Sequence, residues 1–83
     1  MAGITVYTSN RCSTCQMVKA LLALKGFEYT ELNVSVDLEG RRQLLALGFD
    51  TTPVTIVGDR IIQGFDGPRL ESALAGLQRG GPA

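Results

Sequence analysis

A stretch of ten residues decides the fold, and it reads Val6-Tyr7-Thr8-Ser9-Asn10-Arg11-Cys12-Ser13-Thr14-Cys15. Its first part belongs to a short, β-branched run over residues 4–7 that predicts a buried strand. A polar turn then leads to two cysteines in C-x-x-C spacing. From residue 13 to residue 25 apolar side chains recur at helical intervals, and Gly26 ends the pattern. The stretch therefore predicts a strand, a turn that presents Cys12, and a helix that starts at the cysteines.

A second strand and a second helix are expected next. Residues 27–34 alternate weakly and predict the strand. Ser35 or Asp37 can cap the helix that follows, and Gly48 ends it. The expected apolar faces of the first two helices are Met17, Val18, Leu21, Leu22 and Leu24, and Leu38, Leu44, Leu45 and Leu47.

A hairpin and a third helix complete the pattern. Residues 54–57 and 60–63 are strand-like and are separated by Gly58 and Asp59, which predicts a hairpin with a type II′ turn. Pro68 suits the first turn of a helix, because a proline there removes no hydrogen bond. The expected buried stripe of this helix is Leu70, Ala73, Leu74 and Leu77.

The predicted order of elements, β-α-β-α-β-β-α, makes this an α/β protein. The first β-α-β unit is expected to be parallel and right-handed, and the hairpin antiparallel. These connections give a four-stranded mixed sheet with three helices packed on it. We assign residues 1–78 to this single domain and residues 79–83, rich in glycine and proline, to a flexible C-terminal tail.

Composition excludes several classes of function. The 83 residues include eight basic and eight acidic side chains, and no basic stripe of the kind that binds nucleic acid is visible. No apolar run approaches the roughly 20 residues that a membrane-spanning helix needs. The first residues show no pattern of a secretory signal. We therefore expect a cytoplasmic protein that has no nucleic-acid or membrane partner. Because such small domains usually work as monomers, a monomer is expected.

The two cysteines are expected to form a redox pair. A purely structural disulfide is the first alternative, and it is disfavoured because closing a loop of about four residues stabilises a fold by roughly 2 kcal/mol at best. A zinc or iron–sulfur site needs more ligands than two cysteines, and the chain has no histidine, so a metal would have to be shared with another subunit or an outside thiol. Two unreactive thiols are a third alternative, which the placement at a helix start disfavours.

The start of a helix gives the two cysteines different roles. Unpaired backbone N–H groups and the helix dipole favour a thiolate at Cys12, and Arg11 adds a positive charge beside it. We expect the pKa of Cys12 to lie well below the value of about 8.5 for a free thiol. Cys12 is then the thiol that attacks a substrate disulfide, and Cys15, one turn further in, resolves the mixed disulfide. Ser13 and Thr14 between them are expected to tune the reduction potential.

Several further motifs complete a family pattern. They are Lys25-Gly26-Phe27, Leu32-Asn33-Val34, Leu47-Gly48-Phe49, Thr52-Pro53-Val54 and Gly64-Phe65. Together with the segment that leads to C-x-x-C, they make the sequence resemble the glutaredoxins over nearly its whole length. Within that family it is most similar to the NrdH-redoxins, glutaredoxin-like electron donors to ribonucleotide reductase. The resemblance implies a thioredoxin-like fold and a reductase of protein disulfides that cycles between dithiol and disulfide.

The resemblance also implies a substrate-binding surface around the cysteines. In glutaredoxins the proline before the third strand is cis and faces the attacking thiol, and here this is Pro53, with the Thr52 backbone open to pairing with a bound substrate. Phe65, in the turn before the last helix, either contacts a partner protein or lies in the core. Asp66 either caps that helix or contacts a ligand. The full expected set of substrate-binding residues is Arg11, Ser13, Thr14, Thr52, Pro53, Gly64, Phe65 and Asp66.

No bound cofactor is implied beyond the redox-active disulfide Cys12–Cys15. Electrons are expected from NADPH through thioredoxin reductase, or from glutathione, and they pass to a protein disulfide, with ribonucleotide reductase as a candidate substrate. The turn keeps Gly64 and Asp66 of the glutathione-binding pattern but has Gln63 and Gly67 at its other two positions. The alternatives are a glutathione-dependent glutaredoxin that removes glutathione from mixed disulfides, an iron–sulfur carrier in which two chains share a cluster through Cys12 and glutathione, and a non-catalytic interaction module.

Overall fold

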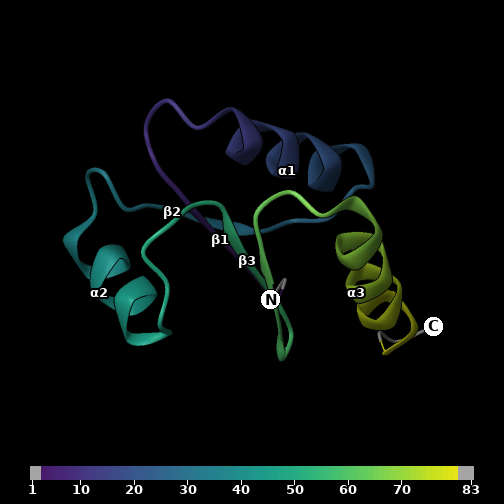
Figure 1. Cartoon of the computed structure of the whole chain (residues 1–83). Coiled ribbons are helices and arrows are strands. Elements are labelled where there is room, and N and C mark those ends of the chain that lie inside the picture. Colours follow the sequence, from purple (N-terminus) through teal and green to yellow (C-terminus); the bar gives the residue numbers. More distant parts are fainter. Residues whose placement is uncertain (1–2, 81–83) are drawn as a thin grey trace.

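Three helices and four strands follow one another in the part of the chain, residues 3–80, that this computed structural model describes. They are β1 (Ile4–Thr8), α1 (Ser13–Leu24), β2 (Thr30–Asn33), α2 (Leu38–Ala46), β3 (Val54–Val57), β4 (Arg60–Gln63) and α3 (Gly67–Gly80) (Figure 1). The predicted order of elements is confirmed. α3 continues into the segment expected to be a tail, whose residues 81–83 lie outside the described ones, so the domain boundary at 78 stays a prediction. None of the helices within residues 3–80 is long and apolar enough to cross a membrane.

The sheet is mixed and has the strand order β2-β1-β3-β4. β1 pairs in parallel with β2 and antiparallel with β3, and β3 and β4 form the predicted hairpin. Gly58 has a φ of 62°, while Asp59 is not among the described residues with positive φ. A positive φ at the first turn position alone is the type II′ pattern. The predicted sheet and its turn are therefore confirmed.

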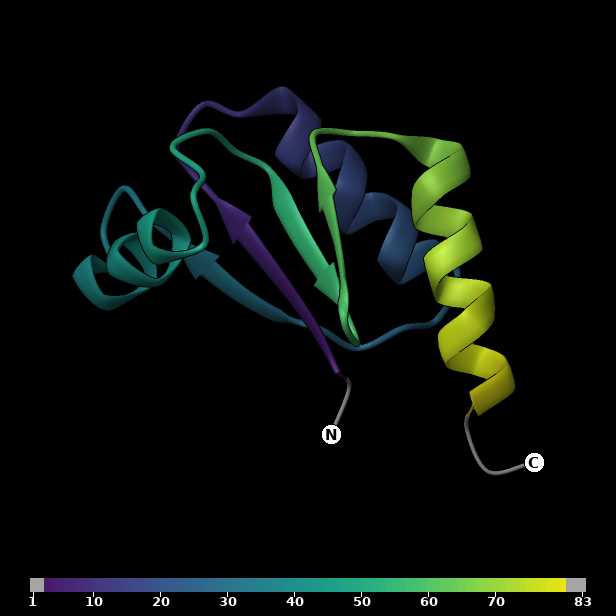
Figure 2. The same ribbon diagram turned by 60° about the horizontal axis from the view of Figure 1, so that its bottom comes forward.

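Helices cover both faces of this sheet, and Figure 2 shows α2 apart from the other two. Because strand side chains alternate between faces, Val6 faces the layer of α1 and α3, whereas Tyr7 faces α2. The predicted stripe of α3 is confirmed, with Leu77 partly buried at its end. The larger core comprises Ile4, Val6, Val18, Leu22, Val57, Ile62, Leu70, Ala73 and Leu74, and the smaller one Tyr7, Leu44 and Val54.

Two residues that the sequence places on the buried face of α1 are exposed. Met17 and Leu24 keep 47% and 86% of their surface accessible. The buried side of the helix is formed instead by Cys15, Val18 and Leu22, at positions i, i+3 and i+7. The prediction is wrong because it counted aliphatic side chains alone, although cysteine is among the most frequently buried residues. The helix is thus rotated so that one cysteine of the pair belongs to its core face.

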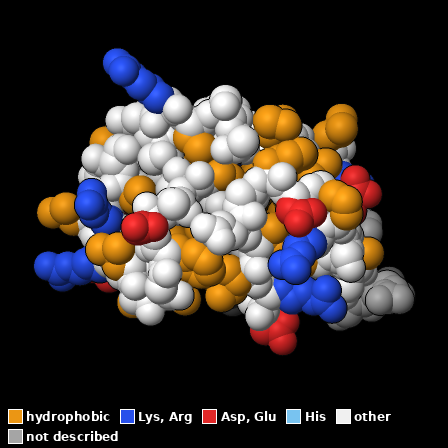
Figure 3. All heavy atoms as spheres, viewed as in Figure 1, with side chains coloured by type: hydrophobic (Ala, Val, Ile, Leu, Met, Phe, Trp, Pro, Cys, Tyr) orange, Lys and Arg blue, Asp and Glu red, His pale blue; other side chains and the backbone are white. Residues whose placement is uncertain are grey.

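α2 buries less of its surface than its sequence predicts. Of the expected apolar face only Leu44 is buried, and apolar side chains reach the surface over this helix (Figure 3). Asp37 is the cap, and its Oδ1 accepts a hydrogen bond from the N–H of Gly40 at 2.9 Å. A Cβ on the buried Gly40 would lie 3.2 Å from the Cβ of Leu32, so this glycine lets α2 approach β2 closely. The expected face residues that are exposed are Leu38, Leu45 and Leu47.

A stability prediction follows from Thr55 in β3. Thr55 is fully buried, and its hydroxyl has no hydrogen-bond partner among the described residues. Valine has nearly the same shape without the polar group, so we expect Thr55→Val to raise the free energy of unfolding by about 1 kcal/mol. Urea denaturation measures this. Thr8→Val is the matched control, because the hydroxyl of the buried Thr8 does have a partner, the Glu31 carboxylate; this change should lower stability. A less stable Thr55→Val protein would contradict the prediction.

Candidate active site

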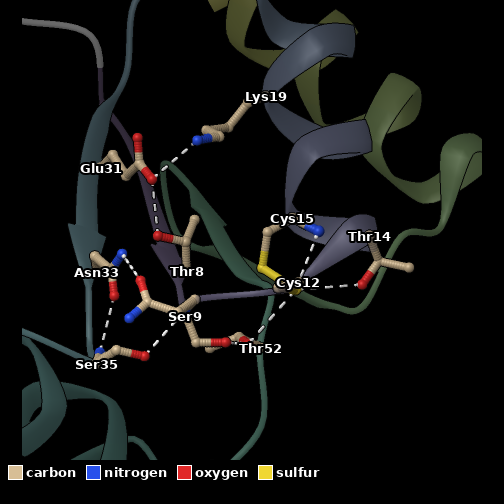
Figure 4. The surroundings of a disulfide bond; sticks show 11 residues. Thr8, Ser9, Cys12, Thr14, Cys15, Lys19, Glu31, Asn33, Ser35 and Thr52 are labelled. Carbon is tan, nitrogen blue, oxygen red and sulfur yellow. Dashed lines mark hydrogen bonds and ion pairs between the residues drawn. A yellow bond between two sulfur atoms is a disulfide. The ribbon is translucent and has the colours of Figure 1, made fainter.

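The two cysteines meet at the N-terminus of α1. Cys12 is the N-cap residue, and its Sγ accepts a hydrogen bond from the N–H of Cys15 at 3.2 Å. The two sulfur atoms are joined in a disulfide, with the Cα atoms 5.2 Å apart (Figure 4). Cys12 is partly exposed, whereas Cys15 is fully buried. The pair is therefore formed as predicted, and Cys12 is the sulfur that an approaching molecule can reach.

Arg11 shapes the turn that presents Cys12. Its φ of 59° is the only left-handed value at a non-glycine residue within residues 3–80, a conformation that costs roughly 1–2 kcal/mol. The turn leaves Cys12 in the extended conformation of an N-cap residue, with φ −110° and ψ 100°. The side chain of Arg11 is exposed and takes part in no hydrogen bond or ion pair with another described residue. Its positive charge is therefore not neutralised by a carboxylate next to Cys12.

The loop before β3 forms a second part of the site. The peptide bond between Thr52 and Pro53 is cis, as the resemblance implied. Pro53 is buried, and its carbonyl oxygen accepts a hydrogen bond from the N–H of Gly64 at 2.8 Å. Gly64 has a φ of 75°, which glycine adopts without steric cost. The structure thus fastens the turn before α3 to the proline loop, and it brings both of these predicted segments together.

Phe65 and Asp66 follow in that turn. Phe65 keeps 37% of its surface exposed, so the alternative that it lies in the core is wrong. The Oδ1 atom of Asp66 accepts a hydrogen bond from the N–H of Arg69 at 3.1 Å, in the first turn of α3. Its Oδ2 atom lies 3.7 Å from Nε of Arg69. Asp66 therefore caps α3, and a contact between Asp66 and a ligand stays a prediction.

Three hydroxyl groups gather near Cys12. Oγ1 of Thr14 lies 3.5 Å from Cys12 Sγ, and Oγ1 of Thr52 donates a hydrogen bond to the same sulfur at 3.7 Å (Figure 4). Ser9 in turn lies 2.6 Å from Thr52, oxygen to oxygen. The sequence singles out Thr14, but it points only to the backbone of Thr52 and passes over Ser9. A polar residue in the turn before the cysteines was the sole signal for Ser9, and nothing in the sequence connects it to Thr52.

Glu31 ties β1, β2 and α1 together next to the cysteines. Its Oε2 atom accepts hydrogen bonds from the hydroxyl of Thr8 at 2.8 Å and from Nζ of Lys19 at 3.1 Å (Figure 4). The hydrogen bond from Thr8 holds the pKa of Glu31 below its usual value, Lys19 acts in the same direction, and partial burial opposes both. Sequence reasoning missed this group, because an acidic residue on an exposed edge strand is usually solvated.

The turn before Cys12 is also fastened to the loop after β2. The N–H of Asn10 donates a hydrogen bond to Oγ of Ser35 at 3.0 Å, and Nδ2 of Asn33 donates to Oδ1 of Asn10 at 3.1 Å. Ser35 is thus a partner of this turn, and it is not the cap of α2. These bonds hold the turn from the side opposite to the proline loop.

Glu31→Gln tests the electrostatic part of this network. Because the pKa of Glu31 in the folded protein lies below the ordinary value of a glutamate, the carboxylate stabilises the fold above that ordinary value, and its contribution disappears as the pH falls through the lowered pKa. With 35% of the side chain exposed, water screens the charge, so we expect the substitution to cost less than about 1 kcal/mol at neutral pH. Urea denaturation at neutral pH, and at a pH below both pKa values where the difference vanishes, measures this.

Glu28→Gln is the matched control for that measurement. The Glu28 side chain is exposed and forms no hydrogen bond or ion pair with the described residues. Its substitution should leave the stability at neutral pH unchanged. A stability loss in Glu31→Gln that persisted undiminished in acid would contradict the electrostatic explanation.

Comparisons with known proteins agree with this geometry. The glutaredoxin family profile matches residues 4–62. The glutaredoxin-like protein NrdH of Salmonella typhimurium is 37% identical over 63 residues, 76% of this chain and 78% of that protein. Among solved structures, a mutant of the thioredoxin-like protein BC3987 superposes with a TM-score of 0.84 at 29% identity, over 90% of this chain and 97% of that one. The NrdH-redoxin from Escherichia coli, described by its thioredoxin-like activity profile, reaches 0.73 at 35% identity over 96% of each chain. The predicted thioredoxin-like fold is confirmed.

Proposed function

The chain belongs to the glutaredoxin family, and from this premise we propose that it is a protein-disulfide reductase of the NrdH-redoxin type that receives its electrons from thioredoxin reductase. It is a thiol–disulfide oxidoreductase with a Cys12–Cys15 pair. The observation that carries the assignment of the attacking and the resolving thiol is the unequal exposure of the two cysteines. Cys12 is partly exposed at the helix start, and Cys15 is fully buried behind it.

In the proposed cycle the reduced protein meets a substrate disulfide. The Cys12 thiolate attacks one sulfur of that disulfide, so that the substrate S–S bond breaks and its other sulfur leaves as a thiolate that takes up a proton. The Cys15 thiol then loses its proton and attacks Cys12 Sγ, which breaks the mixed disulfide and releases the second substrate thiolate. Two electrons have passed to the substrate, and the Cys12–Cys15 disulfide remains. Thioredoxin reductase returns two electrons from NADPH.

Two observations support thioredoxin reductase over glutathione as the donor. The turn around Gly64 has an incomplete glutathione-binding pattern, with Gln63 and Gly67 at two of its four positions. The E. coli NrdH-redoxin, 35% identical over 96% of this chain, has a thioredoxin-like activity profile. We propose ribonucleotide reductase as the first protein substrate to test, and we propose that the protein works as a cytoplasmic monomer.

The substrate is proposed to lie across the turn and loop segments around Cys12. The hydrogen bond from the N–H of Gly64 to the carbonyl oxygen of Pro53 joins two of these segments. Phe65, next to Gly64 in the same turn, is exposed. The proposed contacts on the chain are Arg11, Ser13, Thr14, the Thr52 backbone, Pro53, Gly64, Phe65 and Asp66.

NADPH consumption by the disulfide form distinguishes the electron donors. We expect efficient turnover with thioredoxin reductase alone and little with glutathione plus glutathione reductase, because the glutathione pattern of the Gly64 turn is incomplete. Turnover that requires glutathione would overturn the donor assignment and support the glutathione-dependent alternative. A brown, visibly absorbing protein after anaerobic purification would support the iron–sulfur alternative.

Single substitutions test the proposed roles of the two cysteines. Cys12→Ser should abolish reduction of insulin disulfides, because the attacking thiolate is lost. Cys15→Ser should instead accumulate mixed disulfides with substrate, which mass spectrometry of the intact protein detects. Thr51→Val is the control, since its hydroxyl binds Gln63 rather than a cysteine. An active Cys12→Ser protein would refute the assignment.

A further inference from the structure

A chain of hydroxyl groups ends on the sulfur of Cys12. Oγ1 of Thr52 donates to Cys12 Sγ at 3.7 Å, and Oγ of Ser9 lies 2.6 Å from Oγ1 of Thr52. A threonine hydroxyl has a single proton. Either oxygen can be the donor in the Ser9–Thr52 hydrogen bond. When Thr52 donates its proton to the sulfur, the Ser9 hydroxyl has to donate to Thr52, and both hydroxyls then point from Ser9 through Thr52 to Cys12.

We propose that this hydroxyl chain stabilises the thiolate form of Cys12, with Thr52 acting on the sulfur directly and Ser9 as a positioning residue that acts through Thr52. The inference rests on the proposed function in one respect, since it takes Cys12 as the attacking thiol. A thiolate is a stronger acceptor than a disulfide sulfur or a thiol, so a donated hydrogen bond favours the charged form. A second hydroxyl that donates to the first polarises it and strengthens the effect.

No described charged side chain is paired with the sulfur of Cys12, so a neutral hydrogen-bond donor can have a measurable effect on its pKa. The charged groups on the neighbouring segments are Arg11 in the turn, Lys19 on α1, Asp50 in the proline loop and Asp66 before α3, with Cys15 as the other titratable group. Lys19 is paired with Glu31, and Asp66 with Arg69. No ion pair within residues 3–80 reaches Cys12. The described hydrogen-bond partners of its sulfur are the N–H of Cys15 and the hydroxyls of Thr14 and Thr52.

The test is a pH titration of Cys12 in the full-length Cys15→Ser protein, where it is the only thiol. The ultraviolet absorbance of the thiolate, or the rate of alkylation by iodoacetamide, reports its charge. We expect Thr52→Val to raise the pKa of Cys12 by about one unit, which is a tenfold loss of thiolate at a pH below the pKa. Ser9→Ala should raise it by less. The double variant should match Thr52→Val alone, because Ser9 acts only through Thr52.

Two matched substitutions separate the hydroxyl chain from general disturbance of the loop. Thr52→Ser retains the hydroxyl and should restore the original pKa. Thr51→Val makes the same chemical change one residue earlier, where the hydroxyl accepts a hydrogen bond from Gln63 at 2.9 Å, and should leave the pKa unchanged. Thr52→Ala also removes the hydroxyl without adding bulk, so it replaces Thr52→Val if that protein does not fold.

Each outcome decides something. An unchanged pKa in Thr52→Val or Thr52→Ala would overturn the proposal, as would a Ser9→Ala effect of full size in the Thr52→Val background. The disulfide-reduction activity of Cys12→Ser tests the proposed function by itself. If that activity is lost but Thr52→Val leaves the pKa of Cys12 unchanged, only the role of the hydroxyl chain is refuted. If Cys12→Ser retains its activity, the proposed function is refuted.

Discussion

The placement of Cys12 at the N-cap of α1 is the constraint on which the rest of the site depends. In most helices an oxygen of serine, threonine or aspartate accepts the hydrogen bond from the first free N–H groups. Here a sulfur does so, with the N–H of Cys15 as its donor. The sulfur that caps the start of the helix is thus also the sulfur that a substrate can reach. Because the helix dipole and the cap bond both favour negative charge at this point, the local structure and the chemistry reinforce each other.

This arrangement works only because the helix is held firmly in place. Val18 and Leu22 continue the buried face that Cys15 begins, and they anchor α1 in the larger core. Cys15 is therefore as fixed as any core side chain, while Cys12 lies one turn away at the edge of the packed region. The proline loop is fastened to the Gly64 turn by a single backbone hydrogen bond. The proline loop and the Gly64 turn beside the reactive sulfur are in this way tied to each other and continue directly into β3 and α3.

The sequence predicts what is local and periodic, and it misses what depends on distant pairs. The strands, the hairpin turn and the C-x-x-C placement follow from patterns a few residues long, and all three are present. The exposure of Met17 and Leu24 was missed because the periodicity was counted on aliphatic side chains alone, whereas Cys15, Val18 and Leu22 form the buried side of α1.

Side-chain hydrogen bonds across the fold are hidden in the same way. Ser9 and Thr52 are 43 residues apart, and Thr8 and Glu31 are 23 apart, so their contacts arise only once the sheet has formed. The cis bond before Pro53 was expected from the family resemblance alone. The residues by themselves would predict a trans bond, because most bonds before proline are trans. The rule that a polar turn residue is solvated is correct on average, and it fails for Ser9 because the neighbouring loop brings a second hydroxyl within 2.6 Å.

Neutral hydrogen-bond donors suit a thiol that must both attack and leave. Stabilising a thiolate increases the charged fraction at a given pH, but it also lowers the intrinsic nucleophilicity of the sulfur, so the best attacking thiol has a pKa near the ambient pH. A buried cation would push the pKa much further, and it would attract or repel every partner by charge. Hydroxyls act over a shorter range and add no charge of their own beside Cys12. Thr52 and Ser9 thereby lower the pKa of Cys12 only moderately, and a moderate shift suits a thiol that has to attack in one step and leave in another.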